Sequence, residues 1–100
     1  MRRPGGKPKA PAAARARVLK VDPDTGRSVL CGRLAEAIQR LRRARRLSLK
    51  ALAAQARVSR TMLRLIERGL RVPTVDMEDR IACALGLRAS QLLALAEEGR

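Results

Sequence analysis

The chain contains no phenylalanine, tyrosine or tryptophan, and this absence limits how it can fold. Aromatic side chains usually fill the space between the sheets of a sandwich or barrel. The apolar fraction is nevertheless 46%, so the core must come from leucine, isoleucine, valine, alanine and methionine. A length of 100 residues suffices for one small domain. We therefore expect a compact bundle of helices.

The charge balance points to a polyanionic partner. The chain has 23 lysines and arginines against 9 acidic residues, a formal net charge of +14. Nucleic acid is the commonest polyanion that such a chain meets. Single-strand binders and sheet-based RNA modules stack bases on aromatic rings, which this chain lacks, so double-stranded DNA fits better. The alternatives are a non-specific nucleoid-associated or RNA-binding protein, and a basic surface that serves solubility alone.

Several kinds of site have no support in the sequence. The chain has no histidine, and its two cysteines, Cys31 and Cys83, are far apart, so no zinc spacing is present. We find no nucleophile–base pair, phosphate loop or paired carboxylates, and we expect no metal, no cofactor and no enzyme activity. No apolar run is long enough for a membrane span or a secretory signal. These observations favour a cytoplasmic, nucleoid-associated protein without membrane contact.

The N-terminal third divides into two segments. Residues 1–16 are rich in proline, glycine, alanine and basic residues, which predicts a disordered basic arm. In residues 17–32, the β-prone runs Val18–Val21 and Arg27–Leu30 flank a Pro-Asp-Thr-Gly turn, which predicts a β-hairpin. A lone hairpin is marginal in water, so it must lie against the bundle or pair with its copy in a second protomer. The alternative is that the whole N-terminal segment is disordered.

Residues 33–100 carry helical periodicity throughout. We predict a first helix at Arg33–Arg45, a second capped by Ser48, and a third capped by Ser59 and stopped by Gly69. A fourth opens at Pro73–Thr74 and stops at Gly86, and a fifth runs over Ala89–Glu98. The residues expected to face inward are Leu34, Ile38, Leu41, Arg45, Leu52, Ala53, Ala56, Leu63, Ile66, Ile81, Ala82, Leu85, Leu92 and either Leu95 or Ala96.

The tract from Ser48 to Gly69 predicts two short helices joined by a tight turn. Ala53 is small where the two helices must cross, and Val58 is apolar within the turn. Leu63 and Ile66 would anchor the second helix from beneath. The side chains left pointing outward form a mostly basic face that a major groove accepts: Arg60, Thr61, Arg64, Leu65 and Arg68.

Three motifs in this order carry a family resemblance. Leu52-Ala53 is followed by Val58-Ser59, Ile66-Glu67-Arg68-Gly69 is followed by Pro73, and Ile81-Ala82 is followed by Ala84-Leu85-Gly86. From Leu34 to about Leu93 the chain resembles the Cro/repressor-type, or XRE-like, helix-turn-helix family. The resemblance implies an all-α, five-helix repressor-like DNA-binding bundle whose third helix reads bases. It also implies a homodimer on a palindromic site.

The resemblance assigns DNA contacts by position. Arg60, Thr61, Arg64 and Leu65 are the expected base contacts, and a bidentate Arg60–guanine pair is worth about 1–3 kcal/mol of discrimination. The alternative is that either arginine contacts only the DNA backbone. Phosphate contacts are expected from the backbone N–H groups near Leu49 and Lys50, and from three flanking arginines, Arg43, Arg68 and Arg71.

A structural ion pair is also implied. In the family, the acid at the position of Glu67 pairs with an arginine of the first helix, here Arg42, and the pair sets the angle of the recognition helix. The competing partners for Glu67 are Arg64 and Arg68 on its own helix.

The chain departs from the family pattern at several positions. Leu49 replaces a frequent phosphate-binding glutamine, and Arg57 replaces a glycine, which costs about 1 kcal/mol if the backbone there is left-handed. Glu78 takes a normally apolar position, so we expect Met77 to rotate inward in its place. The function implied is that of a phage-type repressor, a host regulator or an antitoxin with a toxin partner, which share one binding chemistry.

Overall fold

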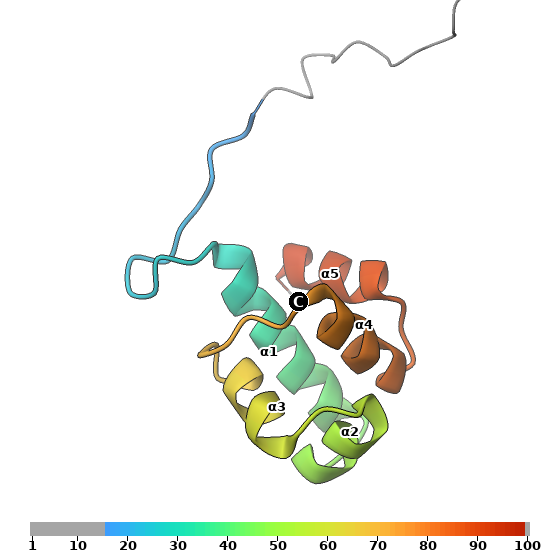
Figure 1. Ribbon diagram of the computed structural model, residues 1–100. Coiled ribbons are helices and arrows are strands. Elements are labelled where there is room, and N and C mark those ends of the chain that lie inside the picture. The colour runs from blue at the N-terminus through green and yellow to red at the C-terminus, as the bar shows by residue number, and fades with distance from the viewer. Residues whose placement is uncertain (1–15, 100) are drawn as a thin grey trace, which may run out of the picture.

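The computed structural model describes residues 16–99, so the predicted basic arm lies almost wholly outside the described residues. The described part of the chain is all-α, as expected, with five helices and no strand longer than a single bridge. Figure 1 shows their arrangement. The helices are α1 (Val29–Ala44), α2 (Leu49–Ala56), α3 (Arg60–Glu67), α4 (Val75–Ala84) and α5 (Ala89–Glu98).

Three of the helices begin at hydroxyl caps, of which Ser48 and Ser59 were predicted as caps and Thr74 lies where the fourth helix was expected to open. The Ser48 hydroxyl accepts a hydrogen bond from the Ala51 N–H at 3.0 Å, and Ser59 accepts one from Met62 at 3.0 Å. Thr74 accepts from the Met77 N–H at 3.1 Å. Each cap satisfies one backbone donor that a helix N-terminus leaves free, which is why α2, α3 and α4 start where they do.

Helix α1 runs through the bundle and contacts both α5 and α3, while α4 joins α2 to α5. Of the residues predicted to face inward, Leu41 is only half-buried and Arg45 is exposed, because α1 ends at Ala44. At the end of α5 the buried residue is Ala96, and Leu95 is half-buried. The core consists of leucine, isoleucine and alanine side chains: Leu34, Ala37, Ile38, Leu52, Ala53, Ala56, Leu63, Ile66, Ile81, Ala82, Leu85, Leu92 and Ala96.

The predicted β-hairpin is reduced to one antiparallel bridge between Val21 and Ser28. Val29 and Leu30, expected in its second strand, form the first turn of α1, which begins four residues before the predicted Arg33. The cause is tertiary. Leu30 packs against the core one turn before the buried Leu34, and this burial outweighs a local preference for a strand. The expected boundary between residues 32 and 33 therefore falls inside a helix.

The segment before α1 is a turn tied to the bundle. The Asp22 side chain accepts from the Asp24 N–H at 2.8 Å, and the Asp22 carbonyl accepts from the Gly26 N–H at 2.8 Å. The Arg27 guanidinium donates to the Gly69 carbonyl at 2.6 Å and to the Leu70 carbonyl at 3.3 Å. A cation at the end of α3 satisfies carbonyls left free there and complements the helix dipole.

Candidate nucleic-acid interface

Helices α2 and α3 are joined by the turn Arg57–Ser59. The Arg57 backbone is left-handed, with φ 58° and ψ 43°, and the Val58 N–H bonds back to the Ala53 carbonyl at 3.0 Å. Ala53 is buried where the helices meet, and Val58 packs against the core. The geometry matches the one expected for a glycine, so arginine stores about 1 kcal/mol of strain here.

The exposed face of α3 is basic. Leu63 and Ile66 are buried beneath the helix, and the N-terminus is held by the Ser59 cap. Arg60, Thr61, Arg64 and Arg68 are exposed, as expected, whereas Leu65 is half-buried. A helix anchored from one side with arginines on the other suits insertion into a major groove. Leu65 offers less surface to a base than the other predicted reading residues.

The predicted phosphate contacts are available at the surface. Arg43, Lys50 and Arg71 are exposed, while the Leu49 side chain packs against the core and leaves only its backbone for a phosphate. Within residues 16–99 the N–H groups of Leu49 and Lys50 donate to no acceptor, since Ser48 takes the N–H of Ala51. Free N–H groups at a helix N-terminus form a ready anion site.

Arg42 and Glu67, which we expected to meet, are in bidentate contact. The Arg42 Nε lies 2.7 Å from Glu67 Oε2 and Nη2 lies 3.0 Å from Oε1, while Nη1 donates to the Leu47 carbonyl at 2.9 Å. Both side chains are mostly buried. The hydrogen bond with Glu67 raises the pKa of Arg42 above its ordinary value, so the guanidinium stays charged. This pair joins α1, the following loop and the end of α3 in one network.

Glu78 is the second buried carboxylate, and it lacks such a partner. Its Oε2 atom is buried and has no hydrogen-bond partner within residues 16–99. Burial raises the pKa of the Glu78 carboxyl, and the negative charge of Asp79 raises it further. Met77 packs against the core, as expected, but it is only half-buried and does not replace Glu78, which itself points into the bundle. Thr74 caps α4 so that Glu78 falls on the inward face with Ile81 and Ala82.

Two features of the site were missed at the sequence level. The contact of Arg27 with Gly69 and Leu70 joins positions more than forty residues apart, and no local pattern signals it. Arg46, after α1, has a left-handed backbone with φ 54°. Nothing in the residues around it distinguishes it from its basic neighbours, so no sequence signal was available.

No cluster of three or more potential metal-ligating side chains occurs among residues 16–99. Within the same residues, no helix combines the length and the apolar character that a bilayer crossing requires.

Comparisons with known proteins agree with this geometry. A family model described as helix-turn-helix, HTH_3, matches residues 38–92. The clp gene regulator ClgR from Corynebacterium glutamicum is similar in structure, with a TM-score of 0.65 and 28% identity over 69% of this chain and 73% of its own. An HTH_3 family transcriptional regulator from Vibrio cholerae gives a TM-score of 0.61 and 37% identity over 65% of this chain and 36% of its own.

A third similar structure is the restriction-modification controller protein C.AhdI from Aeromonas hydrophila. It gives a TM-score of 0.59 and 27% identity over 63% of this chain and 94% of its own. No curated protein sequence matches the chain.

Proposed function

The chain belongs to the helix-turn-helix family HTH_3, and on this premise we propose that it is a transcriptional regulator that binds double-stranded DNA. The observation that carries the proposal is the exposed arginine face of α3, held from beneath by Leu63 and Ile66. The net charge of +14 supplies the long-range attraction to phosphate that such binding needs.

In this proposal Arg60 and Thr61 read bases from the first turn of α3. Arg64 lies one turn further and either reads a base or binds a phosphate. Leu65 contributes at most an apolar contact with a thymine methyl group, since it is half-buried. The remaining contacts position the protein on the backbone without carrying sequence information: Arg43, the N-terminus of α2 at Leu49 and Lys50, Arg68 and Arg71.

The chain acts as a homodimer in this proposal, and each protomer occupies one half of a palindromic site. Two of the similar proteins are described as a gene regulator and a restriction-modification controller, which supports control of particular genes. Repression, activation and service as an antitoxin with a toxin partner are three outcomes of the same binding chemistry.

The test begins with selection of bound duplexes from a random pool, for which we expect a palindromic consensus. Arg60→Ala should then lose preference at one base pair in each half-site, by about 1–3 kcal/mol. The control, Arg71→Ala, should weaken binding to all duplexes alike and reduce the salt dependence by about one phosphate contact.

If Arg60→Ala weakens every duplex equally, Arg60 is a phosphate contact and its assignment is wrong. If the pool gives no consensus and binding collapses uniformly with salt, the protein is a non-specific nucleic-acid binder and the proposed function fails.

A further inference from the structure

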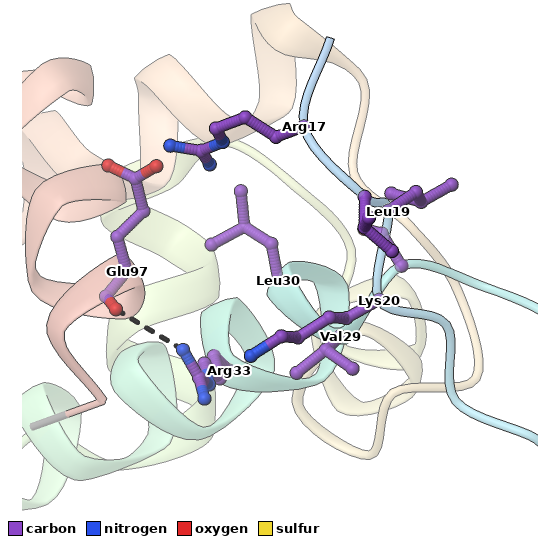
Figure 2. A pocket seen from close by; sticks show the side chains of 9 residues that line it. Arg17, Leu19, Lys20, Val29, Leu30, Arg33 and Glu97 are labelled. Carbon is purple, nitrogen blue, oxygen red and sulfur yellow. Dashed lines mark hydrogen bonds between the residues drawn. The ribbon is translucent and has the colours of Figure 1, made fainter. Parts of the chain in front are cut away.

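The extended segment Arg17–Val21 stands away from the bundle. Val18 is 89% exposed and Leu19 is 70% exposed, although both are large apolar residues. A hollow of about 570 Å³ separates the segment from the start of α1 and the end of α5. Figure 2 shows Leu30 in this hollow, between Arg17 and Arg33. The bundle of the same chain therefore does not cover these apolar side chains.

The backbone of this segment has one used edge and one free edge. The Lys20 carbonyl accepts from the Val29 N–H at 2.9 Å, and the Asp22 N–H donates to the Arg27 carbonyl at 2.8 Å. Because backbone groups alternate between the two edges of a strand, those of Leu19 and Val21 point the opposite way. Within residues 16–99 nothing pairs with them. A second strand can add at this edge.

The free edge is held at its Lys20–Val21 end by the turn that follows it. Hydrogen bonds inside residues 22–27 shape the turn, and Arg27 ties it to Gly69 and Leu70 at the end of α3. A strand edge fixed at one end loses less conformational entropy on pairing than one that is free along its whole length.

We propose that Arg17–Val21 pairs antiparallel with the same segment of a second copy of this chain, and that this pairing is part of the homodimer contact. The proposal rests on the two-copy binding in the proposed function and names its interface. Antiparallel pairing of identical segments is self-complementary, as a two-fold dimer requires.

The register is centred on Leu19. In that register Leu19 lies opposite its own copy, Arg17 lies opposite Val21, and Val18 lies opposite Lys20. The hydrogen-bonding residues are then Arg17, Leu19 and Val21, whose backbone groups share the free edge. A register centred on Lys20 would place two lysines directly opposite each other, which is unfavourable.

The surroundings supply both further area and complementary charge. Stable interfaces bury about 1,200–2,000 Å² in total, more than a five-residue strand pair provides, so the adjacent ends of α1 and α5 must join the contact. Arg17, Lys20 and Arg33 line the hollow together with Glu97, and the next residue, Glu98, is also exposed. A two-fold axis can bring the cations of one copy against the carboxylates of the other.

A different apolar patch provides the control. Leu70, Val72 and Val75 are also exposed, and Val75 reaches 83%. This patch lies in the loop between α3 and α4 and at the start of α4, next to Arg71 and the DNA-binding face of the proposal. Val75 is as exposed as Val18 and Leu19 but has no free strand edge beside it.

The test is sedimentation velocity of the full chain without DNA. Leu19→Asp should weaken dimerisation at least tenfold, and Val75→Asp should leave it unchanged. Circular dichroism should show the same helix content in both, because neither side chain belongs to the core. A monomeric wild type, a Leu19→Asp variant as dimeric as wild type, or loss of the dimer with Val75→Asp alone would each overturn the proposal.

Cysteine cross-linking tests the register in a background in which Cys31 and Cys83 are replaced by serine. Paired residues in this position have Cα atoms about 5.5 Å apart, within the range of a disulfide. Leu19→Cys should form a dimer-linking disulfide under mild oxidation more readily than Lys20→Cys. The reverse preference would overturn the Leu19-centred register. Neither experiment contains DNA, so a negative result disproves the Arg17–Val21 interface alone. The proposed DNA binding is tested separately by the duplex selection.

Discussion

Two carboxylates are buried in the described part of the chain, and their surroundings are opposite. Glu67, at the end of α3, and Glu78, in α4, are only 8% and 6% exposed. Glu67 accepts two hydrogen bonds from the Arg42 guanidinium. Glu78 has an oxygen without any hydrogen-bond partner among residues 16–99, and Asp79 adds a like charge nearby. Burial alone therefore does not say whether a charged side chain stabilises a fold.

Glu67 and Glu78 also differ in the role of the helix that carries each of them. Glu67 belongs to the helix that presents the arginine face, and its contact with Arg42 fixes the end of that helix against α1. Glu78 occupies an inward position of α4 beside Ile81 and Ala82, where an apolar residue would leave no buried polar atom unsatisfied. A buried charge with good geometry can be retained for orientation, whereas an unpaired one costs its desolvation.

The largest loss of stability should come from removing one member of the Arg42–Glu67 ion pair. Glu67→Ala and Arg42→Ala should each lower the free energy of unfolding by about 3–5 kcal/mol, because the remaining charge is stranded in the interior. Chemical denaturation measures both. Arg40→Ala, an exposed arginine on the same helix, is the control and should change little.

The double variant sharpens this result. Because both charges are gone, it should lose less than the sum of the two single losses. Additive losses would mean that the two side chains do not interact in solution.

The second-largest change should be a gain of stability, on replacement of Glu78. Glu78→Leu should raise the free energy of unfolding by about 1–3 kcal/mol, since it removes an unsatisfied buried polar group and keeps a similar volume. Glu36→Leu, at an exposed glutamate of α1, is the matched control and should stay near the wild-type value. A loss of stability with Glu78→Leu would show that Glu78 has a favourable partner in solution.

The smallest expected effect is the pH dependence of the contribution that Glu78 makes to the free energy of unfolding. Burial raises the pKa of Glu78 in the folded state, so its contribution to stability is fully present below the ordinary pKa of a glutamate. As pH rises, the unfolded chain releases this proton first, and the contribution is lost by the time pH passes the raised folded pKa.

The measurement is the difference in unfolding free energy between Glu78→Leu and wild type at a series of pH values. This advantage of the variant should grow from about pH 4 upward and then level off. An advantage that stays constant with pH would show that the carboxyl titrates alike in the folded and unfolded states.

Local features of the chain predicted much of the fold. Ser48, Ser59 and Thr74 cap α2, α3 and α4 because a hydroxyl next to the first turn needs only nearby backbone groups. The spacing of apolar residues identified the core for the same reason, since a helix places every third or fourth side chain on one face. The family resemblance marked Arg57 as a position where glycine is usual, and the backbone there is left-handed.

The candidate DNA-binding face was predictable in part. Arg60, Thr61 and Arg64 are exposed where the period of α3 places them. Leu65 is half-buried, which the outward position assigned to it from the sequence did not predict. How much of an outward side chain remains exposed depends on its surroundings in the folded chain as well as on the helical period.

The sequence by itself determined the starts of α2, α3, α4 and α5, the apolar faces and the basic face of α3, because each depends on residues within a turn or two of one another. Only the tertiary structure decided that Leu30 joins a helix, that Arg27 reaches the carbonyls of Gly69 and Leu70, and that Glu78 is buried without a partner. Each of these outcomes depends on which distant surfaces meet. The free energy of burial and long-range hydrogen bonding then outweighs the local preference of the chain.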